Sequence, residues 1–134
     1  MKDYIRVCDI EKYYGTDKTV TKAVDRVSFA VEQGEFIGVM GASGSGKTTL
    51  LNMLSAIDRV TAGHIFYEDT DITELSEDQI ARFRKDNLGF VFQEYNLLDT
   101  LTLEENIMLA MSLRKEKKSV IEKECREMLR LLGI

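Results

Sequence analysis

The segment GASGSGKTT at residues 41–49 constrains the fold of this chain more than any other feature. It places three glycines and a lysine within seven residues, between the apolar run FIGVM (36–40) and a stretch whose apolar residues recur at helical spacing. The pattern matches G-x-x-x-x-G-K-[ST], a loop whose backbone N–H groups curl around phosphate oxygens. A short, continuous apolar run is typical of a strand buried on both faces. The sequence therefore predicts a strand, a phosphate-binding loop and a helix in succession.

Each residue type in this loop has a physical reason to be there. Glycines permit the backbone to curl, and the N-terminus of the following helix adds a positive dipole end. The ammonium of Lys47 is expected to reach the β- and γ-phosphates, and the hydroxyl of Thr48 to coordinate Mg²⁺. A plain glycine- and serine-rich turn is the structural alternative, but the flanking strand and helix favour binding. The residues expected to bind nucleotide here are Gly41, Ala42, Ser43, Gly44, Ser45, Gly46, Lys47, Thr48 and Thr49.

Strands and helices alternate along the rest of the chain. Alternating or continuous apolar patterns predict strands at 4–10, 22–34, 64–68 and 88–92, with a turn at 12–19. Three pairs with capping-box spacing predict helix starts: Ser76 with Gln79, Thr102 with Glu105, and Ser119 with Glu122. Strands that alternate with helices indicate an α/β protein with a largely parallel sheet.

Composition excludes several classes of function. The net charge is -5, so the chain has no general basic surface for nucleic acid. No apolar run approaches the ~20 residues that a membrane span needs, and the charged N-terminal residues do not resemble a signal peptide. Cys8 and Cys125 are expected to be reduced core residues, and His64, the single histidine, is expected to lie on a strand surface.

Three stretches together resemble the ATP-binding subunit of ABC transporters. They are the segment 27–68 around the glycine loop, LGFVFQEYNLLDTLTLEENI (88–107), and the pair Tyr13 and Tyr14. The subgroup is similar to exporters of antimicrobial peptides, lipoproteins and macrolides, and FQEYNLLDTLTLEENI is especially like bacitracin-resistance ATPases. The resemblance implies a P-loop NTPase fold with a mainly parallel sheet, an antiparallel β subdomain and the start of a helical subdomain. Residues 1–92 would form the core with the β subdomain, and 93–134 the Q-loop and helical subdomain.

The resemblance also implies roles for residues outside the loop. Tyr14 would stack on adenine, with Tyr13 as the alternative if the register is shifted by one. Gln93 would lie in the Q-loop, where its amide oxygen could complete a Mg²⁺ shell or orient a water. The leucines that follow, Leu97, Leu98 and Leu101, would either face a partner or belong to the subdomain core.

The implied ligands are ATP and Mg²⁺, and the implied partners are a membrane-spanning permease subunit and a second ATP-binding subunit, without nucleic acid. The chain would be cytoplasmic and peripheral on the inner face of the cell membrane. The family's signature, Walker B strand, catalytic glutamate and switch histidine do not occur in these 134 residues. The expectation is therefore an N-terminal portion with no catalytic residue of its own, which binds ATP without hydrolysing it alone. Missing central strands would leave apolar edges that favour oligomers.

Three other functions remain open from the sequence. ATPase heads of chromosome-maintenance and DNA-repair proteins share the phosphate loop and the glutamine, but they continue into a long coiled coil, whereas the last apolar stripe here ends at Gly133. A small-molecule kinase gains no support from FQEYNLLDTLTLEENI. A folding or interaction module without enzymatic activity is the third.

Overall fold

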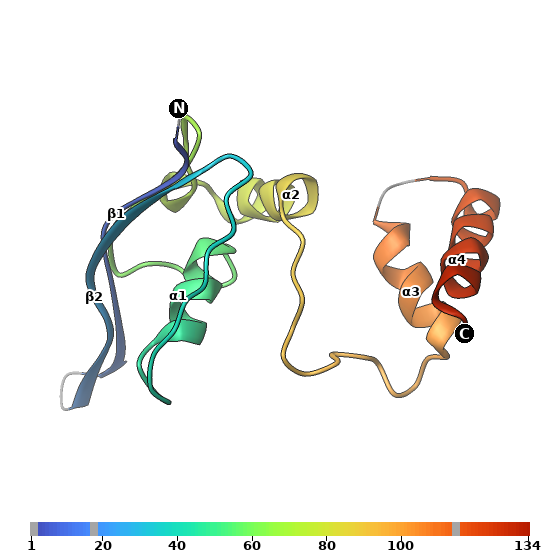
Figure 1. Ribbon diagram of the computed structural model, residues 1–134, viewed down its shortest axis with the longest axis horizontal. Helices are drawn as coiled ribbons and strands as arrows, with labels where there is room; N and C mark the ends of the chain where they lie inside the picture. Colours follow the sequence, from blue (N-terminus) through green and yellow to red (C-terminus); the bar gives the residue numbers. More distant parts are fainter. Residues whose placement is uncertain (1–2, 17–18, 114–115) are drawn as a thin grey trace. The chain divides into compact units, whose positions relative to one another are not determined.

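The computed structural model describes residues 3–16, 19–113 and 116–134, which form two compact units divided between Phe90 and Val91. Figure 1 shows the elements in chain order along the ribbon. The first unit contains β1 (Asp3–Thr16), β2 (Thr19–Glu32), α1 (Lys47–Leu54), β3 (Ala62–Tyr67), β4 (Thr70–Asp71), the 3₁₀ turn η1 (Ile72–Glu74) and α2 (Glu77–Asn87). The second unit contains α3 (Leu103–Ser112) and α4 (Lys118–Leu132).

The first unit is built on a four-stranded sheet in the order β2-β1-β3-β4. Every strand pairing among the described residues is antiparallel, and β1 pairs with β2 on one side and β3 on the other. The helix α1 lies beside the long β1–β2 ribbon (Figure 1). The antiparallel β subdomain expected from the sequence is therefore present.

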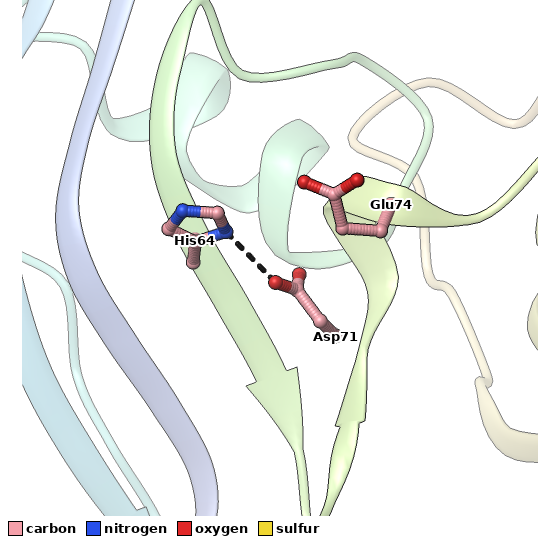
Figure 2. A group of neighbouring side chains, drawn as sticks. All are labelled: His64, Asp71 and Glu74. Carbon is pink, nitrogen blue, oxygen red and sulfur yellow. Dashed lines mark hydrogen bonds and ion pairs between the residues drawn. The ribbon is translucent and has the colours of Figure 1, made fainter.

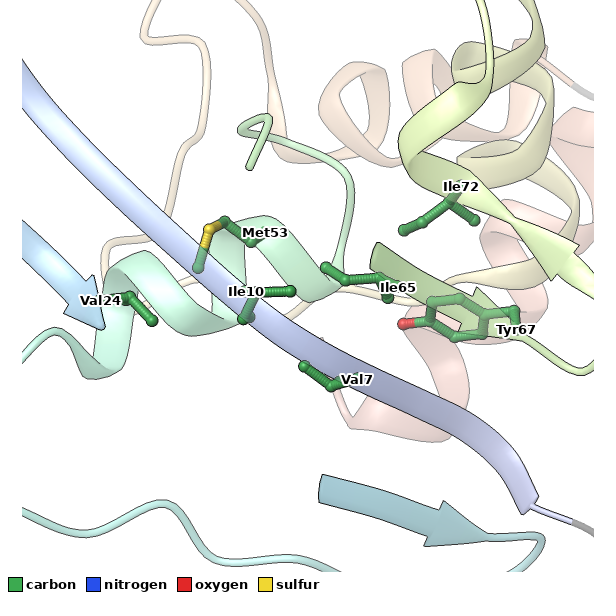
Figure 3. Close-up of a cluster of buried hydrophobic side chains, with 7 residues drawn as sticks. All are labelled: Val7, Ile10, Val24, Met53, Ile65, Tyr67 and Ile72. Atoms are coloured by element: carbon green, nitrogen blue, oxygen red, sulfur yellow. The ribbon is translucent and has the colours of Figure 1, made fainter. Parts of the chain in front are cut away.

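One buried cluster joins this sheet to α1 (Figure 3). Met53, on α1, is 1% exposed and packs among buried side chains of the strands and of η1. The hydroxyl of Tyr67 donates a hydrogen bond to the carbonyl oxygen of Leu54 at 2.6 Å, and burial raises the pKa of this phenol to about 12. These contacts hold the C-terminal part of α1 on the sheet. The buried side chains are Val7, Ile10, Val24, Met53, Ile65, Tyr67 and Ile72.

The second unit packs α3 against α4 around Met111, Ile121 and Cys125. Cys125 is fully buried, and its thiol donates to the carbonyl oxygen of Glu104 at 3.7 Å; burial raises its pKa. Both cysteines are free thiols, as expected, although Cys8 is only partly buried. Leu97 and Leu98 are about half exposed and lie outside this cluster.

Two capping boxes are confirmed and one is wrong. Ser76 with Gln79 caps α2, and Thr102 with Glu105 caps α3, each with both reciprocal hydrogen bonds. The expected box at Ser119 is absent, because α4 already begins at Lys118 and Lys117 is its N-cap residue without a side-chain hydrogen bond. A serine inside the first turn no longer has the extended backbone that a capping side chain requires.

The strands predicted at 36–40 and 88–92 are also wrong for the described residues, where both segments are irregular. Phe36 and Met40 are 97% and 92% exposed. A buried parallel strand needs a hydrogen-bonded neighbour, and neither segment pairs with any described strand. The predicted mainly parallel sheet is therefore not formed by these residues.

The turn predicted at 12–19 is wrong for residues 12–16 and 19, because β1 continues to Thr16 and β2 begins at Thr19. The middle of that turn, residues 17 and 18, lies outside the described residues. Tyr14 is consequently a strand residue that pairs with Thr21 across the ladder. In the part of the chain that the structure describes, no helix is both long and apolar enough to cross a membrane.

Candidate phosphate-binding site

The glycine loop enters α1 through a backbone conformation that only glycine adopts readily. Gly46 is the N-cap residue, with φ 87° and ψ 6°, in the left-handed region. A Cβ atom at this position would lie 2.3 Å from the carbonyl oxygen of Ala23 on β2. The loop and β2 therefore approach so closely that glycine is required for both its positive φ and its missing side chain.

Lys47 is held by the loop itself. Its Nζ donates hydrogen bonds to the carbonyl oxygens of Gly41 and Ala42, at 2.9 and 2.6 Å, and lies 3.4 Å from Oγ of Ser45. The side chain is partly buried, in contrast to most of the exposed loop. The ammonium is thus bound by the same segment whose spacing predicts phosphate binding, and its hydrogen bonds go to two carbonyl oxygens of that segment.

The N-terminus of α1 is electrostatically open to an anion. No side chain caps it, and its first turn contains no acidic residue. The first amide N–H groups of a helix have no acceptor within the helix, and they carry the positive end of the dipole. Thr48 lies in this turn and is exposed, so its hydroxyl is accessible to a metal ion. The residues present therefore fit a phosphate group with a bound Mg²⁺ ion.

Tyr14 lies next to this helix. Its ring is 44% exposed, and its hydroxyl donates to Oδ2 of Asp58 at 2.6 Å. The hydrogen bond to Asp58 is the main cause that raises the pKa of Tyr14, followed by burial, whereas a hydrogen bond with the Thr49 hydroxyl acts in the opposite direction. The structure therefore fixes the hydroxyl of the aromatic residue expected to stack on adenine on Asp58, which follows the C-terminal end of α1.

Asp58 receives three donors, and sequence reasoning did not identify it. Lys12 Nζ donates to its Oδ1 at 2.6 Å, the backbone N–H of Arg59 donates to the same oxygen at 2.8 Å, and Tyr14 binds the other oxygen. Burial acts to raise the pKa of Asp58, but these hydrogen bonds outweigh it and the pKa is lowered. No spacing rule links Asp58 to a residue 44 positions away.

The remaining expected residues are placed as follows. Tyr13, the alternative to Tyr14, donates its hydroxyl to Glu11 on its own strand and lies under Lys22, 5.2 Å from the ring centroid. Gln93 belongs to the second unit, in the irregular segment before α3, and is exposed. Its role at the magnesium ion stays a prediction.

A group of three side chains of the kinds that bind metal ions lies on β3, β4 and η1 (Figure 2). His64, Asp71 and Glu74 each place a ligand atom within 4.8 Å of the others. Nδ1 of His64 is already 2.8 Å from Oδ2 of Asp71, and Oδ1 of Asp71 accepts from the backbone N–H and the hydroxyl of Thr73. Asp71 therefore caps η1 and pairs with an exposed histidine, and these bonds explain the cluster without a metal ion. His64 is a strand surface residue, as expected.

Comparison with known proteins finds relatives that align with most or all of the chain. Residues 24–134 match the family model described as ABC transporter. The chain is 46% identical over 130 residues to the bacitracin export ATP-binding protein BceA of Halalkalibacterium halodurans, covering 97% of this chain and 51% of that protein. It is 37% identical over 134 residues to the lipoprotein-releasing system ATP-binding protein LolD of Cytophaga hutchinsonii, covering 100% of this chain and 59% of that protein.

Among solved structures, the chain resembles the dimeric, post-hydrolysis ATP-binding cassette MJ0796 bound to ADP and Pi. The TM-score is 0.86 at 29% sequence identity, over 97% of this chain and 57% of that one. The chain spans about half the length of the curated relatives it matches.

Proposed function

The chain belongs to the ABC transporter family, and we propose that it is an ATP-binding subunit which couples ATP binding and hydrolysis to export through a membrane partner. The observation that carries the proposal is the glycine loop, with Lys47 held by the carbonyl oxygens of Gly41 and Ala42 at the uncapped start of α1. A loop of this shape offers several N–H donors and one ammonium to a single anion. The substrates proposed are peptides, lipids or drug-like molecules.

Each proposed binding residue has a separate task. Residues 41–49 bind the phosphate groups through backbone N–H groups, and the Lys47 ammonium exchanges its carbonyl partners for phosphate oxygens. Thr48 would hold the Mg²⁺ ion that accompanies the nucleotide, and the role of Gln93 at this ion remains the expectation from the family resemblance. The ring of Tyr14 stacks on adenine, an interaction worth ~1–3 kcal/mol per base. These residues bind and orient the nucleotide, and we assign none of them as catalytic.

The proposed partners are a membrane-spanning permease subunit and a second ATP-binding subunit, with the chain peripheral on the cytoplasmic face of the membrane. Support comes from the export and release systems named for the relatives, and from the dimeric form of the structural neighbour. The net charge of -5 gives no support to nucleic acid as a partner. The alternative as an ATPase head of a chromosome-maintenance or DNA-repair protein is not favoured by these relatives.

Calorimetric titration of Mg-ATP into the wild-type chain and the Lys47→Ala variant tests the proposal. We expect the variant to bind at least about 100-fold more weakly, because charge-assisted hydrogen bonds to phosphate are lost. The matched control is Lys118→Ala, which removes an exposed ammonium that lies 3.8 Å from Glu122 on α4. Equal affinity of wild type and Lys47→Ala would refute the assignment of the loop.

A further inference from the structure

Lys12, Tyr14 and Asp58 form a hydrogen-bonded network. Lys12 and Tyr14 lie on β1, whereas Asp58 follows the C-terminal end of α1. The backbone N–H of Asp58 donates to the carbonyl oxygen of Asn52 in α1 at 3.1 Å. The network therefore ties the strand that presents the aromatic ring to the helix that begins at the glycine loop.

Asp58 is the centre of this network, because both of its oxygens are used. Oδ2 accepts from the Tyr14 hydroxyl at 2.6 Å, and Oδ1 accepts from Lys12 Nζ at 2.6 Å. The Lys12 side chain is only 12% exposed, and it donates a further hydrogen bond to the Arg59 carbonyl oxygen at 2.6 Å. Charge-assisted hydrogen bonds of this kind are the strong ones, and they fix the geometry of the groups they join.

Lys12 also restricts how the ring can be used. Its Nζ lies over the Tyr14 ring, 5.0 Å from the centroid, which is within the range of a cation–π contact. One face of the ring is therefore taken by the ammonium, and a base can stack only on the other face. With the hydroxyl tied to Asp58 as well, the ring plane has little freedom to rotate away from a bound base.

We propose that Asp58 is a positioning residue for the nucleotide base: it holds Tyr14 and Lys12 so that one face of the Tyr14 ring is presented to adenine. This inference rests on the proposed function, because it assigns a task at the same nucleotide site. Preorganisation of an aromatic contact raises affinity by removing the cost of ordering the side chain when the ligand binds. Asp58 contacts no ligand in this arrangement and acts through Tyr14.

The experiment compares two ligands, Mg-ATP and Mg-tripolyphosphate, by calorimetry on the full chain. Tripolyphosphate has the phosphate groups but no base, so it reports on the glycine loop alone. The variants are Tyr14→Phe, which keeps the ring and removes the hydroxyl, and Asp58→Asn, which removes the charge. We expect each to weaken Mg-ATP binding by up to about 10-fold, because the Tyr14 side chain must then be ordered when the base binds, and to leave tripolyphosphate binding unchanged.

The chain offers a closely matched control in the neighbouring tyrosine. Tyr13 also donates its hydroxyl to a carboxylate, that of Glu11, and also lies under a lysine, 5.2 Å from its ring centroid. Tyr13→Phe and Glu11→Gln should leave the affinity for both ligands unchanged. The double variant Tyr14→Phe with Asp58→Asn should lose no more affinity than Asp58→Asn alone, since the Tyr14 hydroxyl is held by Asp58.

The outcomes separate this inference from the proposed function. A wild-type chain that binds Mg-ATP, with Tyr14→Phe and Asp58→Asn variants that bind it equally well, overturns the positioning role and leaves the proposed function intact. Equal losses for Mg-ATP and tripolyphosphate also overturn it, since Asp58 would then support the loop and not the ring. Absence of Mg-ATP binding by the wild-type chain overturns both. Circular dichroism of each variant confirms that it is folded before the affinities are compared.

Discussion

Replacement of Gly46 by alanine isolates the close approach between the glycine loop and the sheet. Two costs add at this position. A non-glycine residue in the left-handed region costs roughly 1–2 kcal/mol, and the new Cβ atom, 2.3 Å from the carbonyl oxygen of Ala23, forces backbone to move, at about 1–3 kcal/mol. We therefore expect Gly46→Ala to lower the free energy of unfolding by about 2–5 kcal/mol.

Gly44→Ala is the matched control, because Gly44 also has a positive φ, +77°, but a Cβ atom there would meet nothing within 4 Å. Gly44→Ala should lower the free energy of unfolding only by the cost of the left-handed backbone conformation, about 1–2 kcal/mol. Urea unfolding followed by circular dichroism measures both variants against wild type, and an unchanged slope shows that the comparison is valid. If Gly46→Ala and Gly44→Ala lower the free energy of unfolding by amounts that agree within about 0.5 kcal/mol, the scatter of neutral substitutions, the contact between Gly46 and β2 is refuted.

Two further predictions concern the support of α1. Tyr67→Phe removes the buried hydrogen bond to the Leu54 carbonyl oxygen, so it should lower the free energy of unfolding in urea by about 1–3 kcal/mol. The control is Tyr4→Phe, at a tyrosine whose ring centroid lies 6.2 Å from that of Tyr67, and it should lower this free energy less. A larger loss for Tyr4→Phe would contradict the assignment. The second prediction concerns pH: because the pKa of Asp58 is lowered in the folded state, its stabilisation is complete above the ordinary aspartate pKa near ~4 and is lost as the pH falls through the lower folded-state value. Asp58→Asn should reduce this acid sensitivity, as measured by unfolding midpoints between about pH 6 and about pH 3.

Local sequence signals were sufficient for several elements. The capping boxes at Ser76 and Thr102 were predictable, because the hydrogen-bonding partner lies three residues along the chain. The glycine loop was predictable for the same reason, since its donors and its lysine belong to one short segment. The box at Ser119 failed because its spacing alone does not show where a helix begins, and the N-cap residue of α4 is Lys117, two residues earlier.

Features that depend on distant residues were not predictable from one sequence. The apolar pattern at 36–40 identifies a segment suited to burial, but whether it becomes a strand depends on the strands available to pair with it. Tyr14 was expected in a turn, and its place on β1 follows from pairing with Thr21 on β2. Asp58 had no recognisable signal at all, because its partners Lys12 and Tyr14 come from the other end of the unit's sequence.

The hydrogen bonds from Lys47 to the carbonyl oxygens of Gly41 and Ala42 have a consequence for the proposed anion site, because an anion would have to compete with them for the ammonium. An incoming anion must replace two neutral acceptors that already bind the Lys47 ammonium. The net gain in binding free energy is therefore only the amount by which the ammonium interacts more strongly with phosphate oxygens than with these carbonyl oxygens. Chloride or a simple carboxylate would bring a single negative charge, whereas a polyphosphate brings several. Under the proposed function, a triphosphate would bring several charged oxygens at once and displace both carbonyl oxygens, so the loop's own backbone would favour polyphosphates over singly charged anions.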